Sequence, residues 1–347
     1  MPNQKQYSVY DIKKEDTLES IVAFFEKSKQ EIVGFHNIYA KQDDLIGMEL
    51  PRHLQQLFLY PNLHYKATGI ATHLNENYLH HHYHKIINNF RIQYTATIGE
   101  QKMYVDFDIS LQNKGVFRQG HIYEINKISA TEINGDDDLN DIEDVKELLL
   151  NLIYPIQVLV RENGTWQELL YDKRIVKRFE VAKKNILEFY KGQIVDDLLH
   201  HAEKNVTNEI SFKNSFEDNW LLDAIFSNVY RYYNNNESMS EDLHFAILQS
   251  VPPQDFLVLQ NISHFDEKKK QVTINKKGIL NDERTRKEFE QLAKEQNYDD
   301  LDDAVVTGVL EQNIVLNVET FALESVHLTS SLNLQEKRVV EVLVNRK

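Results

Sequence analysis

The sequence contains no cysteine among its 347 residues. A disulfide framework, a thiolate zinc site and a cysteine nucleophile are therefore excluded. Glycine (11 residues) and proline (6 residues) are also scarce, since typical usage is about 7% and about 5%. The motifs GxGxxG, GxxxxGK[ST], HExxH and GxSxG are absent from the sequence. The chain thus offers no familiar phosphate loop, zinc-protease helix or nucleophile elbow, and we expect neither a cofactor nor an enzyme.

Long apolar runs are missing as well. No stretch approaches the roughly 18 apolar residues of a membrane-spanning helix, and residues 1–10 contain no apolar signal core. We therefore expect no membrane span, and a protein that stays in the cytoplasm or is exported without a signal peptide. Basic residues are outnumbered, with 39 Lys and Arg against 54 Asp and Glu and a net charge of −15. This balance argues against nucleic acid and anionic membranes as partners, because both are bound through clustered Lys and Arg.

Hydrophobic residues (41%) and aromatic residues (10%) are sufficient for substantial cores. Alternating segments and amphipathic segments follow one another along the chain, which predicts an α+β protein with antiparallel sheets and helices. The length suggests about two or three domains. We expect them at residues 1–61, 62–240 and 241–347, and the last two can form one body.

The first domain is predicted from a strand–helix–helix–strand pattern. A short strand around Tyr10 leads to Asp16, which we expect to cap a helix over Thr17–Lys27 and to form a capping box with Glu19. A second capping box, between Ser28 and Glu31, predicts a helix that ends near Asn37. A strand over Leu57–Tyr60 completes the unit.

This unit resembles the LysM module. The residues at the family's spacings are Tyr10, Ile12, Asp16, Thr17, Leu18, Ile21, Val22, Phe25 and Ser28. Asn37 is similar to the family's Asn on the second helix. The resemblance implies a βααβ fold and a ligand groove between two loops, formed here by Asp16, Thr17, Leu18, Asp43, Leu45, Ile46 and Gly47. Two departures, Glu15 in place of the family's Gly and an inserted segment at Arg52–Gln56, lie near those loops.

The remaining chain shows strands and helices in turn. Alternation predicts a half-buried strand over Met103–Leu111. Glu162-Asn163-Gly164 predicts a hairpin between strands at 155–160 and 166–170, followed by helices over 174–191, 194–204 and 218–232. Further strands are expected at 244–248, 256–262, 271–275, 305–310, 314–320, 325–334 and 338–344, with a helix after residue 282. Strand, turn, strand and helix occur at both 155–191 and 256–297, which favours an internal duplication.

Three places have the residue types of metal ligands. His80 and His84 are spaced i, i+4 and would share a helix face, but no Asp, Glu or Cys completes a set. The run Asn134–Asp138 lacks the order of a calcium loop, and a solvated loop is the better interpretation. His200-His201 beside Asp196-Asp197 reads as an exposed helix edge. We therefore predict no metal site.

Three functional hypotheses remain. The first is a non-enzymatic adaptor or scaffold, in which the LysM-like module docks one protein and the acidic body holds another with complementary basic charge. By analogy with LysM-like parts of contractile injection and type VI secretion machines, it would serve as an adaptor or structural component. The second is a cell-wall protein that binds peptidoglycan or another polymer of N-acetylglucosamine. The third is a carboxylate-dependent hydrolase, although none of the 54 acidic residues is singled out by its context.

Overall fold

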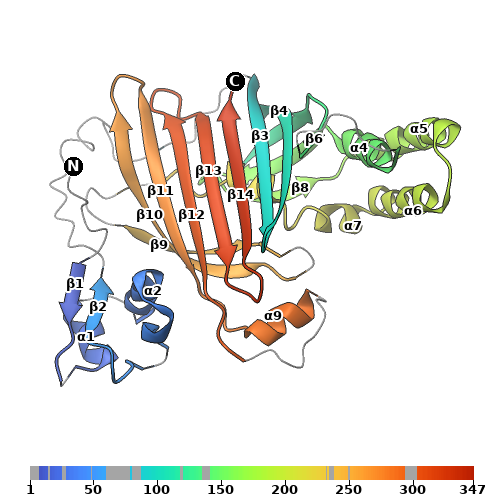
Figure 1. Ribbon diagram of the computed structural model, residues 1–347. Coiled ribbons are helices and arrows are strands. Elements are labelled where there is room, and N and C mark those ends of the chain that lie inside the picture. Colours follow the sequence, from blue (N-terminus) through green and yellow to red (C-terminus); the bar gives the residue numbers. More distant parts are fainter. Residues whose placement is uncertain are drawn as a thin grey trace.

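The computed structural model describes residues 8–14, 16–25, 29–47, 49–59, 79, 87–117, 120–134, 141–231, 233, 238–248, 251–293 and 303–347. Figure 1 shows a small N-terminal module beside a broad antiparallel sheet, with a group of helices at the far edge of that sheet. The protein therefore has the α+β composition that the sequence predicts.

The N-terminal module contains two strands and two helices. They are β1 (Ser8–Asp11), α1 (Leu18–Phe25), α2 (Lys29–Tyr39) and β2 (Gln56–Leu59), with a 3₁₀ turn at Gln42–Asp44. β1 and β2 pair antiparallel, with Ser8 opposite Leu59 and Asp11 opposite Gln56. The module has a hydrophobic core of its own, made of Leu18, Ile21, Ile32, Ile46, Leu57 and Leu59. The second predicted capping box lies outside the described side chains.

The body is organised by one large antiparallel sheet. Its strands are β3 (Ile87–Ile98), β4 (Gln101–Phe117), β5 (Gly120–Lys127), β6 (Glu132–Ile133), β7 (Ile156–Arg161), β8 (Trp166–Leu170), β9 (Met239–Phe245), β10 (Gln254–Asp266), β11 (Gln271–Leu280), β12 (Gly308–Asn317), β13 (Leu323–Leu332) and β14 (Arg338–Arg346). The order is β8-β7-β5-β4-β3-β14-β13-β12-β11-β10-β9, and β6 pairs with β4. Because β14 pairs with β3, strands from residues 62–240 and 241–347 share one sheet.

The two faces of the sheet differ in polarity. Alternate residues of the central strands are buried and apolar, for example Val340, Val342 and Val344 of β14 and Phe90 and Ile92 of β3. The intervening residues point to the opposite face, because side chains along a strand alternate between faces. These residues are largely polar. Helix α8 (Trp220–Ile225) packs on the apolar face against β13 and β14. The main core therefore lies on that face.

Helices α4 (Asp141–Ile153), α5 (Arg174–Phe189), α6 (Gln193–Thr207) and α7 (Glu209–Asn214) form a helical arm beside β8. Figure 1 shows α5 and α6 extending beyond the edge of the sheet as an antiparallel pair. Gly192 makes the turn between them with φ +128°, a conformation that favours glycine. Helix α9 (Arg286–Leu292) begins with a capping box between Thr285 and Glu288.

Several predicted elements have different limits in the structure, and the clearest cases are one helix and a pair of strands. The helix predicted over 218–232 ends at Ile225, because the backbone N–H groups of Val229 and Tyr230 both donate to the carbonyl of Asn163 in the β7–β8 turn. Gly164 permits this close approach, since a Cβ there would lie 2.6 Å from the carbonyl oxygen of Ser227. The strands predicted at 305–310 and 314–320 are a single strand, β12.

The N-terminal module contacts the sheet through α2. This helix packs on β10 and β11, and Figure 1 shows it on the side of the module nearest the sheet. Gly34 of α2 is buried, and a Cβ at this position would lie 2.0 Å from Cδ1 of Ile279 in β11. A larger residue at position 34 would therefore displace the end of the Ile279 side chain.

Candidate functional site

The first loop of the predicted groove is fixed to strand β1. The carboxylate of Asp16 accepts hydrogen bonds from the backbone N–H of Lys13 and from the hydroxyl of Tyr10, both at 2.8 Å. Both hydrogen bonds lower the pKa of Asp16, and the bond from Lys13 contributes more than the bond from Tyr10. Asp16 is therefore held as a carboxylate at the end of the strand.

The cap of α1 differs from the prediction. The hydroxyl of Thr17 accepts from the backbone N–H of Ser20 at 3.1 Å, and the hydroxyl of Ser20 accepts from the backbone N–H of Thr17 at 2.9 Å. The reciprocal pair is thus Thr17 and Ser20, and not Asp16 and Glu19. Because Asp16 already bonds to Lys13 and Tyr10, the next residue serves as N-cap.

The second loop of the groove is held by side chains of α2. Asn37 donates to the carbonyl of Ile46 at 2.9 Å and accepts from its N–H at 2.8 Å. His36 is fully buried and stacks on Phe58 with ring centroids 5.3 Å apart. Its Nδ1 accepts from the N–H of Phe58, so the neutral ring carries its proton on Nε2, 3.0 Å from the carbonyl oxygen of Asp44. Burial lowers the pKa of His36, which favours this neutral form.

The seven predicted groove residues fall into two groups. Leu18 and Ile46 are 2% and 3% exposed and belong to the module's core, so they hold the two loops together from beneath. Thr17, Asp43 and Gly47 are exposed, and Asp16 and Leu45 are half-buried. The surface available to a partner is therefore formed by the second group.

The segment predicted as an insertion, Arg52–Gln56, connects the two loops. The carbonyl of Gln55 accepts from the N–H of Ile12 at 2.9 Å, just after β1. On the other side, Nε2 of His53 lies 2.7 Å from the carbonyl oxygen of Asp43. Leu54 packs against the module's core. The segment thus bonds to both loops of the predicted groove, a role that no spacing in the sequence predicted.

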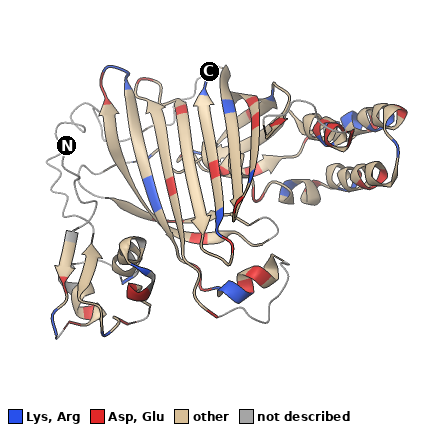
Figure 2. Ribbon diagram, in the orientation of Figure 1, with Lys and Arg blue, Asp and Glu red and all other residues tan. Residues whose placement is uncertain are grey.

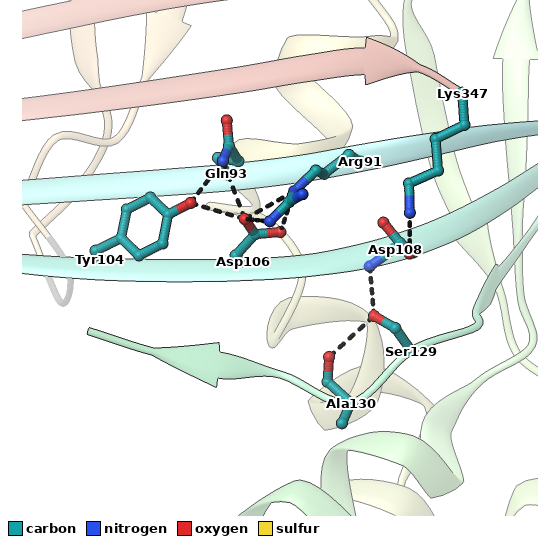
Figure 3. Close-up of polar contacts among 8 residues, drawn as sticks. All are labelled: Arg91, Gln93, Tyr104, Asp106, Asp108, Ser129, Ala130 and Lys347. Carbon is teal, nitrogen blue, oxygen red and sulfur yellow. Dashed lines mark hydrogen bonds and ion pairs between the residues drawn. The ribbon is translucent and has the colours of Figure 1, made fainter. Parts of the chain in front are cut away.

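A second polar group lies on the polar face of the sheet. Figure 3 shows Arg91 and Gln93 of β3 converging with Tyr104 of β4 on the carboxylate of Asp106. Arg91 reaches Asp106 at 2.6 Å through Nη2 and at 2.9 Å through Nε. Gln93 and the Tyr104 hydroxyl donate at 3.0 and 2.7 Å. Although burial opposes ionisation, these donors lower the pKa of Asp106, so the carboxylate is occupied by structural bonds.

The same face carries an ion pair that joins the chain's last residue to the sheet. Lys347 donates to the carboxylate of Asp108, and the N–H of Asp108 donates to the hydroxyl of Ser129 at 2.7 Å (Figure 3). The alternating pattern predicts that every second residue of β4 is exposed. Asp108 is half-buried instead, and Asp106 is only 3% exposed. Burial of a charged residue is tolerated there because Arg91 compensates its charge.

A third group of polar side chains is buried on the apolar face. Lys276 of β11 is fully buried and donates to Glu241 of β9 at 2.6 Å. Asn228 donates to the other oxygen of Glu241 at 2.6 Å, and Arg231 lies 3.5 Å from it. Burial lowers the pKa of Lys276, while Glu241 opposes that shift. Through Glu241, these contacts connect the edge strand β9 to the segment after α8.

Metal coordination finds no support in the part of the chain that the structure describes. No group of three or more His, Asp or Glu side chains there is placed to hold an ion. His201 of the predicted helix edge bonds to the carbonyl of Asp197 within α6. His80, His84 and residues 135–138 lie outside the described residues.

Comparisons with known proteins give no family. No protein-family model matches the chain, and no curated protein matches it significantly. No helix in the described ranges is long and apolar enough to cross a membrane.

Proposed function

We propose that the protein is a non-enzymatic adaptor whose LysM-like N-terminal module docks a partner protein. The proposal rests above all on the 52–56 segment. It bonds to Ile12 on one side and to Asp43 on the other, and we infer that it leaves no room for a sugar chain between these two loops. The rim formed by Asp16, Thr17, Asp43, Leu45 and Gly47 remains for a protein surface.

The rigidity of this rim supports protein docking. Asn37 fixes both backbone polar groups of Ile46, and His36 and His53 engage the carbonyls of Asp44 and Asp43. A surface whose backbone is already ordered loses less entropy when it binds. The module also has a core separate from that of the body, so it can present the rim while the sheet serves another contact.

The body supplies the second half of the proposed adaptor. Asp106 and Glu241 are each engaged by two or more donors, which suits structural roles better than proton transfer to a substrate. The excess of acidic residues favours cargo with basic charge. Extending the analogy to LysM-like parts of contractile injection and type VI secretion machines, we propose that the chain acts in the cytoplasm as an adaptor or structural part of such a machine.

The test compares the full-length protein with two matched variants. Leu45→Arg places a charge in the rim, and Leu292→Arg makes the same change at a 42% exposed position on α9. We expect a host protein to copurify with the wild type and with Leu292→Arg. Its affinity should fall at least about tenfold for Leu45→Arg, which corresponds to about 1.4 kcal/mol. Equal retention by all three proteins would contradict docking at the rim.

The glycan alternative is tested with the same proteins. We expect no heat of binding when oligomers of N-acetylglucosamine are titrated into the wild type at millimolar concentration. Binding that is present in the wild type and in Leu292→Arg but lost in Leu45→Arg would replace the adaptor proposal by cell-wall recognition. Release of shortened oligomers during the titration would instead indicate a hydrolase.

A further inference from the structure

Two histidines contact the same turn of the N-terminal module, one buried and one exposed. Nε2 of His36 lies 3.0 Å from the carbonyl oxygen of Asp44, and Nε2 of His53 lies 2.7 Å from that of Asp43. His36 is fully buried, whereas the side chain of His53 is 61% exposed. The two rings therefore hold one turn from different surroundings.

His36 also contacts strand β2. Its Nδ1 accepts a hydrogen bond from the N–H of Phe58 at 3.0 Å, and the two rings stack with an angle of 18° between their planes. Both bonds of His36 form only when the ring is neutral and carries its proton on Nε2, because Nδ1 must accept while Nε2 donates. One tautomer thus joins the turn at Asp44 to β2.

A second proton on His36 is incompatible with these contacts. In the imidazolium both ring nitrogens carry a hydrogen, so Nδ1 would direct a donor at the N–H of Phe58. The bond from Nε2 to Asp44 would survive, but the positive charge would be held away from water, which is costly unless the charge is paired. The ring must reach water to relieve this cost, and that movement separates the turn from β2.

His53 responds differently to the same proton. Its Nε2 lies 3.5 Å from the carboxylate of Asp44 as well as close to the carbonyl of Asp43. A protonated His53 keeps its donor on the carbonyl and is attracted to the carboxylate. Because this ring is exposed, its charge also stays hydrated. Of the two histidines on the turn, protonation therefore weakens only the contacts of His36.

The surroundings of His36 offer little to neutralise a cation. Asp44 is the charged group that favours protonation of the ring, but burial outweighs it, and the pKa of His36 is lowered. The neighbouring strand β2 contains no Lys, Arg, Asp or Glu and is tan along its length in Figure 2. A proton on this ring therefore works against the closed arrangement.

The other elements that pack on α2 are α1, β10 and β11. Their charged side chains have partners of their own: Glu19 of α1 with Lys29, Asp255 of β10 with His244, and Lys276 and Lys277 of β11 with Glu241 and Glu311. His264 and Asp266 lie about 20 Å or more along β10 from Leu257, which pairs with Ile279 at the α2 contact.

We propose that His36 is an acid-sensitive latch, in which proton uptake by the ring releases the loop at residues 42–47 from β2. This loop carries Asp43, Leu45 and Gly47 of the rim, so mild acid loosens the surface proposed for docking. The latch can be tested without a partner, whereas its effect on docking rests on the proposed function.

The direction of the pH effect follows from the two states of the ring. In the open loop the ring has the ordinary histidine pKa of 6.5, and in the closed loop it has a lower one. The stability of the closed loop is therefore fully present above pH 6.5 and is lost as the pH falls toward the lowered pKa. Between the two values the opening equilibrium constant rises by up to about tenfold per pH unit.

The experiment measures amide hydrogen exchange in the full-length protein between about pH 7.5 and about pH 5, where histidine titrates and ordinary carboxylates do not. The protection factors of Phe58 and Ile46 report on the latch and the loop, after correction for the intrinsic pH dependence of exchange. His36→Gln keeps a donor and an acceptor but does not ionise. His53→Gln is the matched control, because it changes the exposed histidine on the same turn.

We expect the protection factors of Phe58 and Ile46 to fall at least about fivefold over this range in the wild type and in His53→Gln. In His36→Gln they should change less than about twofold. The amide of Val326 in β13 should keep its protection, which would show that the body is not loosened. If His36→Gln does not fold, ¹⁵N signals of the wild-type ring give the same test: proton uptake by His36 should coincide with the loss of protection at Phe58.

Two results would overturn the latch. One is the same loss of protection in the wild type and in His36→Gln. The other is a His36 ring that gains its second proton while the Phe58 amide stays protected. A separate outcome concerns docking: if the loop opens as expected but a copurifying partner is retained equally at both ends of the pH range, the latch is supported and docking at the rim is contradicted.

Discussion

The carboxyl group of Asp223 offers a sharp test of the physical picture, because it is a largely desolvated, half-buried acid to which the indole of Trp166 donates. It lies in α8, and the indole N–H of Trp166 donates to it at 2.8 Å. Burial raises the pKa of Asp223 from 3.8 to about 7, and the nearby charge of Asp218 adds to the rise, while the bond from Trp166 opposes it. The group is therefore neutral in the folded protein below about pH 7.

The sign of the effect on stability follows from the two pKa values. In the unfolded chain the carboxyl ionises above about pH 4, and in the folded chain only above about pH 7. Between these values the folded state binds the extra proton, so stability falls as the pH rises, by about 1.4 kcal/mol per pH unit. Above about pH 7 the whole cost is present and amounts to about 4 kcal/mol.

The assay is unfolding in guanidinium chloride between pH 5 and pH 8, with wild type and Asp223→Asn compared at each pH. Asparagine has the same shape and keeps an oxygen that accepts from Trp166, but it does not ionise. We expect the stability of the variant relative to the wild type to increase by about 3 kcal/mol between pH 5 and pH 8. Trp166→Phe removes the donor that favours the carboxylate, so it should move the wild-type transition to higher pH.

A difference between Asp223→Asn and wild type that is the same at every pH would refute the reasoning. It would mean that Asp223 is ionised in the folded protein across the whole range. Water or a rearranged side chain would then solvate the carboxylate, and the layer between α8 and the β7–β8 hairpin would be less dry than the structure shows.

Two further predictions concern the N-terminal module. Thr17→Ala should destabilise the first turn of α1 by about 1 kcal/mol, which would be seen as faster hydrogen exchange at the amide of Ile21. Glu19→Ala should change that exchange little. A larger effect of Glu19→Ala than of Thr17→Ala would instead support the capping box expected from the sequence. Gly34→Ala should displace the end of the Ile279 side chain, at an overpacking cost of about 1–3 kcal/mol against a gain in helix propensity of about 1 kcal/mol. The double variant Gly34→Ala/Ile279→Ala should be more stable than the sum of the two single changes predicts; additive changes in thermal unfolding would show that the two residues are not in contact.

Local signals in the sequence were sufficient for most individual elements. The hairpin around Asn163-Gly164 forms β7 and β8 at nearly the predicted positions, because the turn type is set by residues next to each other. The same holds for α5 and for the strands of the N-terminal module. The resemblance of that module to LysM stays a prediction, as does the internal duplication, although a hairpin followed by a helix does occur at both β7-β8-α5 and β10-β11-α9.

Long-range contacts account for the differences between the predicted and the observed strands. The sequence gives no local sign that Arg91 and Asn345 face each other across β3 and β14, because pairing between distant strands depends on the register of the whole sheet. The strands predicted at 305–310 and 314–320 leave out Glu311-Gln312-Asn313, which the structure places inside β12. Gln312 is buried within the strand because it accepts from Ser227 at 3.1 Å and donates to the carbonyl of Ala224 at 3.2 Å.

In the candidate groove, too, local features were predicted from the sequence and contacts between distant segments were not. Its two loops were placed from the residues of the module itself, but His36 was missed. A histidine among apolar residues of a helix reads as a core position, and its bonds to Phe58 and Asp44 come from segments 22 and 8 residues away. The bridging role of His53 was missed for a similar reason, since an insertion carries no pattern that indicates which loops it contacts.

Net charge alone is a poor guide to the partners of this protein. The Debye length at physiological ionic strength is about 8 Å, which is much shorter than the roughly 24 Å of α5. A partner near α5 therefore experiences the lysines at 173, 177 and 184 together with Glu180 and Glu188, and little of the acidic charge elsewhere on the body.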